Sequence, residues 1–409
     1  MNFFLDSLAE RLAATWRRPQ ATARAGHNYR CTCGRPAFFR NSQCLGCQAP
    51  LGFVVDQLAV VTLTADPEKP EFTVAGAAAT ERYRRCSNFD GPAGCNWMVP
   101  VTDPEPLCRS CRLNRTIPDL SVTENGELWR RVELAKRRLV AQLLRLGLPL
   151  QSRVTEDPDG GLMFDFLRTP PGAPRILTGH DDGLITLNVE EADDAIREKI
   201  RTELREPYRT LLGHLRHEVG HYYWDRLIDK TSWQEPFRTL FGDERADYAE
   251  ALKKNYEAGP TPDWAQSHVS SYASVHPWED WAETFAHYLH TVDALNTALG
   301  FGLDVEDLEF ESEPFTKESL FDPDSPDATR FLALINSWVE LTAVLNELAR
   351  SMGQPDLYPF VLSKPAVKKL HFVHLVVLEA RQKATASPAP QSVALPETAE
   401  SCEAKPGKG

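Results

Sequence analysis

His217-Glu218-Val219-Gly220-His221, an HExxH motif, is the stretch that decides the fold of this chain. Apolar spacing predicts that the motif lies in one helix from about Asp194 to Ile228. Residues four apart share a helix face, so His217 and His221 can present both imidazoles to one Zn²⁺, with Glu218 near a water bound to that ion. The motif is therefore the core of a predicted zinc hydrolase site. The alternative is a pair of partly exposed histidines beside a solvated glutamate.

The residues around the motif favour a buried helix beside a strand. An apolar stripe would bury the helix; it consists of Leu211, Leu212, Leu215 and Val219. A hairpin is predicted before it, with strands at Arg175–Thr178 and Leu184–Val189 and the turn residues Asp182-Gly183. Such a strand could pair with an extended peptide through main-chain hydrogen bonds.

A catalytic zinc usually has three protein ligands, so HExxH requires a third one elsewhere. The metzincins would have Gly at position 224 and His at position 227, where this chain has Trp224 and Leu227, which excludes that class. The segment from Pro277 offers a carboxylate instead, since Glu279 and Glu283 share one face of a predicted helix. We expect Glu279 to bind zinc and Glu283 to orient a zinc-bound imidazole.

Several nearby groups are alternatives to this ligand set. Acids in the first turn of a helix are favoured by the helix dipole, and we interpret Asp280 in this way. The histidines that could replace Glu279 as third ligand are His276, His287 and His290. His214 lies three residues before His217 on the same face, and we expect it to support the site or face the substrate rather than bind metal.

The order of these motifs resembles the lethal-factor-like branch of the gluzincin metallopeptidases. In that branch HExxH is followed some fifty residues later by a Tyr, by a Glu seven positions on, and then by xxAExF; the matching residues are Tyr272, Glu279 and Ala282 to Phe285. The resemblance implies that Glu279 is the third zinc ligand and that Tyr272 stabilises the oxyanion. Tyr272 could instead be an aromatic core residue.

A longer resemblance, from about Tyr29 to about Leu378, is to bacterial zinc-binding metallopeptidases with N-terminal zinc ribbons. The stretches that carry it are Cys95 to Trp97, Cys108 to Asn114, Ile117 to Ser121, His217 to Tyr222, Phe241 to Arg245 and Pro277 to Phe285. It implies a zinc-dependent peptidase. In such a site Glu218 accepts a proton from the zinc-bound water and passes it to the leaving amine, while Tyr272 donates a hydrogen bond to the oxyanion.

Eight of the nine cysteines precede residue 112, in two groups of four. The first quartet is Cys31, Cys33, Cys44 and Cys47, and the second quartet is Cys86, Cys95, Cys108 and Cys111. Each quartet suits one structural zinc, although the sequence leaves open which cysteines share a metal. Iron and disulfides are alternatives, but a disulfide framework expects a secreted protein. We interpret Cys402, in a low-complexity tail, as an incidental free thiol.

Charge and hydropathy indicate where the protein is located and which partners it can bind. Asp6 and Glu10 interrupt the first apolar residues, which argues against a signal peptide, so we expect a cytoplasmic protein. No apolar run reaches the roughly twenty residues of a membrane span, and we expect a soluble chain without a transmembrane segment. The formal net charge of -13 disfavours nucleic acid as a partner, so we expect the ribbons to bind protein or to stabilise the fold.

The 409 residues predict an α+β, mostly helical chain, in which four-cysteine zinc-ribbon modules precede a zincin-like (gluzincin) domain with a small twisted sheet. The expected parts are an N-terminal helical extension (1–25), the zinc-ribbon region (26–118), the metallopeptidase domain (119–383) and a disordered tail (384–409). Further helices are predicted at Leu128–Leu146, Phe241–Tyr256, 277–298, 326–352 and 365–382, and strands at 57–64, 71–75 and 162–167.

Three functions fit these observations, and we rank them in the following order. The first is a zinc peptidase of gluzincin type that acts on peptides or proteins, with one catalytic and two structural zinc ions. The second is a zinc-ribbon scaffold that binds protein or nucleic acid and carries an inactive domain, but a decayed site should have lost Glu218 or a ligand, and all are present. The third is hydrolysis of a non-peptide amide, which has no need of a substrate-pairing strand.

Overall fold

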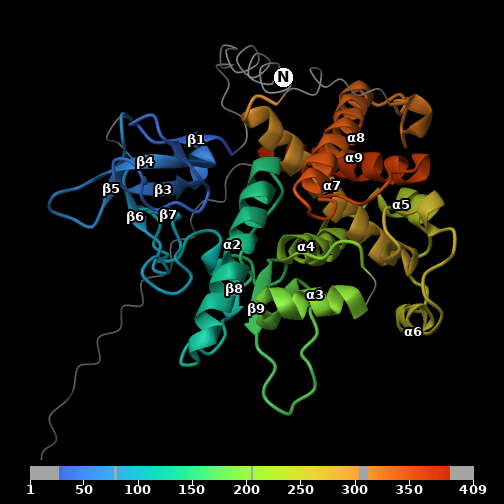
Figure 1. Cartoon of the computed structure of the whole chain (residues 1–409), viewed down its shortest axis with the longest axis horizontal. Coiled ribbons are helices and arrows are strands. Elements are labelled where there is room, and N and C mark those ends of the chain that lie inside the picture. The colour runs from blue at the N-terminus through green and yellow to red at the C-terminus, as the bar shows by residue number, and fades with distance from the viewer. Residues whose placement is uncertain (1–26, 78–80, 204–205, 304–311, 387–409) are drawn as a thin grey trace, which may run out of the picture.

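The computed structural model describes residues 27–77, 81–203, 206–303 and 312–386. The predicted N-terminal extension, most of the predicted tail and Cys402 lie outside the described residues. Figure 1 shows a β-rich N-terminal region on one side of a long helix, α2 (Thr123–Leu146), and most other helices on its far side. This mixture of helices and small sheets agrees with the predicted α+β class.

The N-terminal region is built on a five-stranded antiparallel sheet in the order β3-β4-β5-β6-β7. Its strands are β3 (Leu51–Val54), β4 (Ala59–Ala65), β5 (Phe72–Val74), β6 (Tyr83–Arg85) and β7 (Met98–Pro100). A hairpin of β1 (Tyr29–Arg30) and β2 (Pro36–Ala37) precedes the sheet. Phe53 stacks on Trp97 with ring centroids 4.4 Å apart, so these two buried rings form part of the core beneath the sheet.

Helix α2 connects this region to the remainder of the chain. Its buried apolar face includes Val132, Leu139 and Leu143, which belong to the spacing that predicted the helix. The helix begins five residues before the predicted start and ends at Leu146 as predicted, where Gly147 adopts a φ of 70° that favours glycine.

The second sheet has the order β10-β11-β9-β8 and leaves β10 at its edge. Its strands are β8 (Asn114–Thr116), β9 (Met163–Leu167), β10 (Gly179–Asp181) and β11 (Leu184–Asn188). The predicted hairpin exists, but its first strand lies at 179–181 and not at 175–178. Asp182 and Gly183 have φ values of 43° and 78°, as in a two-residue turn, so the first strand must run directly into Asp182.

The single helix predicted from Asp194 to Ile228 is wrong, because two helices stand in its place. They are α3 (Asp194–Glu203) and α4 (Leu211–Leu227). Pro207 lies between them; proline lacks an N–H and disfavours the helical conformation in the residue before it. Thr210 then caps α4, since its hydroxyl accepts a hydrogen bond of 2.9 Å from the N–H of Gly213.

The helix predicted at Phe241–Tyr256 is also wrong. The structure has α5 (Gln234–Phe241) and α6 (Tyr248–Ala258) instead. Gly242, with a φ of 109°, ends α5, and Asp247 caps α6 by accepting a hydrogen bond from the N–H of Glu250.

Three long helices complete the chain close to their predicted bounds: α7 (Pro277–Gly300), α8 (Ala328–Ser351) and α9 (Lys364–Ala386). Helix α7 packs against α4, α8 and α9, and Figure 1 shows α7, α8 and α9 together. Short 3-10 turns are η1 (Val55–Gln57), η2 (Cys111–Leu113), η3 (Val189–Ala192), η4 (Trp264–Gln266), η5 (Tyr272–Ser274) and η7 (Lys317–Ser319). By length and composition alone, α8 is the one helix among the described residues that could cross a membrane.

The contact between α4 and α7 depends on Gly220 within the HExxH motif. A Cβ on Gly220 would lie 2.9 Å from Cα and 3.1 Å from the carbonyl oxygen of Ala282 on α7. Only glycine allows the two backbones to approach this closely. The two helices that carry the predicted ligands are thereby held side by side.

Candidate metal centre

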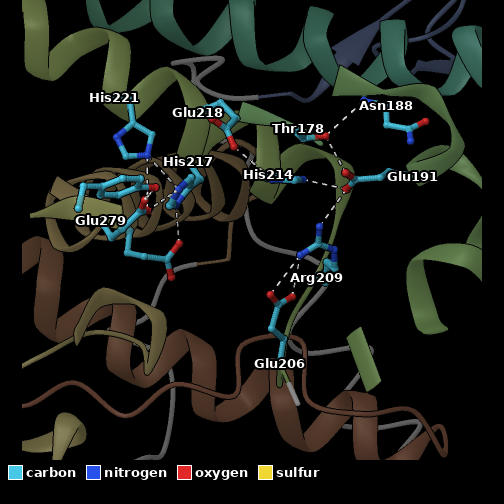
Figure 2. Close-up of polar contacts among 12 residues, drawn as sticks. Thr178, Asn188, Glu191, Glu206, Arg209, His214, His217, Glu218, His221 and Glu279 are labelled. Carbon is cyan, nitrogen blue, oxygen red and sulfur yellow. Dashed lines mark hydrogen bonds and ion pairs between the residues drawn. The ribbon is translucent and has the colours of Figure 1, made fainter. Parts of the chain in front are cut away.

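The structure brings the three predicted ligands together between α4 and α7 (Figure 2). Nε2 of His217 lies 3.2 Å from Nε2 of His221 and 3.0 Å from Oε2 of Glu279. The remaining distance, from Nε2 of His221 to Oε2 of Glu279, is 3.5 Å. All three residues are buried.

This donor set fits Zn²⁺. In a tetrahedral zinc site with bonds of about 2.0 Å, neighbouring ligand atoms lie about 3.3 Å apart, as they do here. Oε2 of Glu279 is buried and accepts no hydrogen bond from the described residues, which leaves a charged oxygen in need of a cation.

Glu283 contacts the imidazole of His217. Its Oε1 lies 2.7 Å from Nδ1 of His217, and its Oε2 accepts a hydrogen bond of 2.5 Å from the hydroxyl of Ser270. Burial would raise the pKa of Glu283, but the hydrogen bond with His217 and the neighbouring charges lower it to about 2. The carboxylate therefore fixes Nδ1 of His217 as a donor and leaves Nε2 free to bind metal.

Tyr248 is a residue of the site that sequence reasoning missed. Its hydroxyl, at the start of α6, donates a hydrogen bond of 2.5 Å to Oε1 of Glu279. Glu279 thus has one oxygen bonded to a phenol and the other directed at the histidines. No periodicity marks Tyr248, because its role depends on how α6 lies against α7.

Glu218 lies beside the three donors and is held by His214. Nε2 of His214 lies 3.2 Å from Oε1 of Glu218, and its Nδ1 lies 2.8 Å from Oε2 of Glu191 (Figure 2). Burial opposes the charge on His214, but Glu191 and Glu218 outweigh burial and raise its pKa to about 9. His214 is therefore an imidazolium at neutral pH and contacts Glu218 from outside the donor set.

Glu191, another residue that the sequence did not single out, ties this pair to the edge of the sheet. Its Oε1 accepts a hydrogen bond of 2.7 Å from the hydroxyl of Thr178, just before β10. Its Oε2 accepts another, of 3.1 Å, from Nη2 of Arg209, just before α4. Burial works against the ionised form of Glu191, yet His214 and Arg209 hold its pKa far below the ordinary value.

Tyr272, the predicted oxyanion donor, opens η5 and lines the same cavity as Glu218. Its ring centroid lies 5.9 Å from that of His217. Burial raises its pKa far above the ordinary value, so the phenol keeps its proton and can donate a hydrogen bond. The cavity has a volume of about 490 Å³ and is also lined by Gly179 and His180 of β10.

The alternative histidines do not join the three donors. His276 caps α7 by accepting a hydrogen bond from the N–H of Trp278. Nδ1 of His287 lies 2.6 Å from the hydroxyl of Tyr358, and Nδ1 of His290 lies 2.7 Å from Nη1 of Arg216.

Asp280 lies in the first turn of α7, as predicted, and has a partner that the sequence did not indicate. Its carboxylate is buried and accepts a hydrogen bond from Nζ of Lys369 on α9. The ion pair joins residues 89 positions apart, which the local sequence pattern does not reveal.

The cysteines form the two predicted quartets. Sγ of Cys31 lies 3.5 Å from Sγ of Cys47, and Sγ of Cys33 lies 3.7 Å from Sγ of Cys44. In the second quartet the corresponding distance between Cys95 and Cys108 is 3.6 Å. Tetrahedral zinc with bonds of about 2.3 Å to sulfur requires about 3.8 Å, so both quartets fit the ion.

The two quartets differ in their surroundings. Cys33 and Cys47 of the first quartet are exposed, whereas every cysteine of the second quartet is buried. Arg137 of α2 lies beside the second quartet; its Nη2 donates to the carbonyl oxygen of Ala93. Burial would lower the pKa of Arg137, but Cys95, Glu133 and then the other nearby cysteines raise it. A buried cation of α2 thus offsets the negative charge of this quartet.

Comparison with known proteins gives two family matches. The model of a family described as "Putative zinc-binding metallo-peptidase" matches residues 125–376, and a zinc-ribbon domain model matches residues 28–122. Uncharacterized proteins of Mycobacterium bovis and Mycobacterium tuberculosis are 42% identical over 348 residues, which cover 85% of this chain and 94% of theirs. No solved structure matches the chain.

Proposed function

Because the chain belongs to the family of zinc-binding metallopeptidases, we propose that it is a zinc-dependent peptidase of gluzincin type. The observation that carries this proposal is the convergence of His217, His221 and Glu279 in the cavity that Glu218 also lines. Structural zinc sites have four protein ligands, whereas catalytic sites have three and keep one position open. Three donors beside a cavity favour the catalytic kind.

These three donors would hold one Zn²⁺, which when bound lowers the pKa of a water and polarises a carbonyl. Glu283 and Tyr248 keep the donors in position: the first fixes the ring of His217, and the second fixes the carboxylate of Glu279. Such supporting hydrogen bonds raise metal affinity because the ligands need no reorganisation.

We propose that Glu218 is the general base. Burial would raise its pKa, but the hydrogen bond with His214 and the neighbouring charges lower it, so Glu218 is a carboxylate ready to accept a proton. It takes one proton from the attacking water and gives it to the nitrogen of the peptide bond that breaks. The imidazolium of His214 holds Oε1 during both steps.

Two further features support a peptide as the substrate. Tyr272 can donate its phenolic proton to the oxygen that gains charge during attack. Strand β10 is the edge of its sheet and lines the cavity, so an extended peptide can pair with its free backbone groups.

For the zinc-ribbon region, 26–118, we propose a structural role beside the catalytic domain, 119–383. The burial of the second quartet against α2 supports it, because a metal there would stabilise the contact between the two parts. A protein partner remains an additional proposal for the first quartet, in which Cys33 and Cys47 are exposed.

Metal analysis and peptide hydrolysis test the proposed function together. We expect about three zinc ions per chain, one for each donor group, and about two in His217→Ala. Glu218→Gln should keep all its zinc and lose cleavage of a mixed peptide library, measured by mass spectrometry. Glu235→Gln, at an exposed position, is the matched control. Cleavage by Glu218→Gln would remove its assignment as base, and a zinc-loaded wild type that cleaves nothing would favour the scaffold function.

A further inference from the structure

Beside the metal centre, the structure assigns a subsite for an aromatic side chain of the substrate, with a floor made by Tyr208, His290 and Phe360. The inference rests on the proposed peptidase function, since it concerns a residue next to the bond that is cleaved. All three rings line the cavity that contains the metal donors, and all three are only half-buried. Each ring therefore keeps a surface that a ligand can contact.

The cavity reaches this floor because α4 and α7 run antiparallel beneath it. From His221 back to Gly213, α4 meets Glu279, then Glu283, then His290 of α7. Gly213 lies four residues, about 6 Å along the helix, from the metal donor His217, so a large side chain next to the cleaved bond can reach the floor. A volume of about 490 Å³ is within the range of ligand sites and leaves room for a large side chain.

Four rings at this end of the cavity meet edge to face. Tyr208 and His290 have centroids 5.4 Å apart at 89°, and His287 and Phe360 have centroids 4.5 Å apart at 85°. The distances that close the circle are 6.0 Å for His287 with His290 and 6.1 Å for Tyr208 with Phe360. Gly213 permits this packing, because even a Cβ there would lie 3.1 Å from Cε1 of Tyr208. A substrate ring would extend the same edge-to-face pattern.

His290 of the floor and the neighbouring His287 carry no charge. Arg216 has only donors, so Nδ1 of His290, 2.7 Å from its Nη1, must accept and the proton of the ring is on Nε2. Burial also lowers the pKa of His290 well below the ordinary value and that of His287 to about 4. Neutral rings favour an aromatic ligand over an acidic one.

Carboxylates that line this part of the cavity already have partners. Both oxygens of Glu206 accept hydrogen bonds from Nη1 of Arg209, at 3.1 and 3.0 Å. Both oxygens of Glu283 are engaged by His217 and Ser270. Glu203 is exposed and lies 3.9 Å from the ammonium of Lys199. A lysine or arginine of the substrate would find ring faces there but no buried free carboxylate.

Amino-acid hydroxamates test the subsite without requiring turnover, since the hydroxamate binds zinc and the side chain probes its surroundings. We would measure dissociation constants of the glycine, leucine, lysine and phenylalanine compounds for the zinc-loaded full chain by calorimetry. Phenylalanine hydroxamate should bind roughly fivefold or more tightly than the leucine compound. Equal affinities, or tightest binding of the lysine compound, would overturn the subsite. If even glycine hydroxamate fails to bind, the proposed metal function fails and this inference fails with it.

Variants of the floor residues test whether the preference for phenylalanine hydroxamate depends on them. Tyr208→Ala should reduce the ratio of phenylalanine to leucine affinity to about one, while glycine hydroxamate binds as before. Phe360→Leu keeps apolar volume but removes a ring, and should have the same effect in a well-folded chain. Tyr256→Ala is the control, because Tyr256 lines the same cavity from α6 and is 68% exposed. An unchanged ratio in both floor variants would contradict the assignment.

Discussion

Tyr248 donates a hydrogen bond of 2.5 Å to Oε1 of Glu279 from α6, a helix that buries none of its own residues. The third donor of the metal centre is thus oriented by a phenol on a lightly packed element. The same helix carries Tyr256, whose mostly exposed side chain lines the cavity. Both the orientation of Glu279 and one wall of the cavity therefore depend on α6.

Replacement of Tyr248 by Phe removes this hydrogen bond and keeps the ring. We expect the zinc affinity of the His217, His221 and Glu279 site to fall about tenfold, because supporting hydrogen bonds of metal ligands have effects of this size. Competition with a zinc chelator measures the change, and the quartet sites serve as internal references. Tyr256→Phe, on the same helix, should leave affinity unaltered, and an equal effect of both variants would contradict the assigned role.

Replacement of Glu191 by Gln removes the charge that keeps His214 protonated. His214 has a pKa of about 9, so in the wild type it is charged below that pH and loses its proton, and its hydrogen bond to Glu218, as pH rises through it. We expect the alkaline limb of the kcat profile to move to lower pH in Glu191→Gln, with zinc content unchanged. Glu190→Gln, the neighbouring acid, is the control. An alkaline limb at the same pH in both variants would show that His214 does not hold the base.

Replacement of Gly220 by Ala tests the close approach of α4 and α7. The added Cβ would meet the backbone of Ala282 at 2.9 Å, and backbone atoms cannot turn aside as a flexible side chain can. We expect a loss of about 1–3 kcal/mol in the free energy of unfolding, measured by urea denaturation. Gly126→Ala on α2 is the contrast, because its Cβ would lie 3.4 Å from Cβ of Pro92 in ordinary contact. A loss in Gly126→Ala as large as in Gly220→Ala would refute the argument.

Replacement of Asp293 by Asn tests the buried ion pairs that join the ribbon region to α4 and α7. Asp293 lies 2.8 Å from His27 and 2.9 Å from Arg216, and although burial opposes its charge, these partners hold its pKa far below the ordinary value. The ionised carboxylate of Asp293 therefore makes its full contribution to the free energy of unfolding above the unfolded pKa of about 3.9. This contribution is lost as pH falls toward the folded pKa.

At pH 7 the Asn variant should be about 3 kcal/mol less stable, and this difference should shrink below about pH 4. Thermal unfolding followed between pH 3 and 7 measures both effects. Asp194→Asn, whose side chain is 77% exposed, should change stability little. A difference that stays constant with pH would mean that the carboxylate charge is not the cause.

Local patterns predicted the elements and the ligands that depend on periodicity. Residues four apart on one face suffice to predict His217 with His221 and Glu279 with Glu283, and their geometry follows from the helix. The breaks at Pro207 and Gly242 were missed because apolar spacing continues across them. At these positions a proline and a glycine with positive φ interrupt the helix, although the apolar spacing continues.

Two supporting residues, Glu191 and Tyr248, could not be predicted, because they come from elements separate from α4 and α7. Glu191 meets His214 only after the chain turns from η3 through α3 to α4, and Tyr248 meets Glu279 only when α6 folds back on α7. Their residue types are common on helix surfaces, where a solvated acid or a packed tyrosine is the ordinary outcome. Tertiary contacts alone distinguish them.

The burial of the second quartet against α2 also orders events during synthesis. Cys86 to Cys111 leave the ribosome before the helix whose Arg137 offsets their charge. In the first quartet, by contrast, two of the four cysteines are exposed. The first quartet needs only the chain as far as β4, where the hydroxyl of Thr62 donates to Sγ of Cys31, whereas the second reaches its final surroundings only when the chain has grown past Leu146.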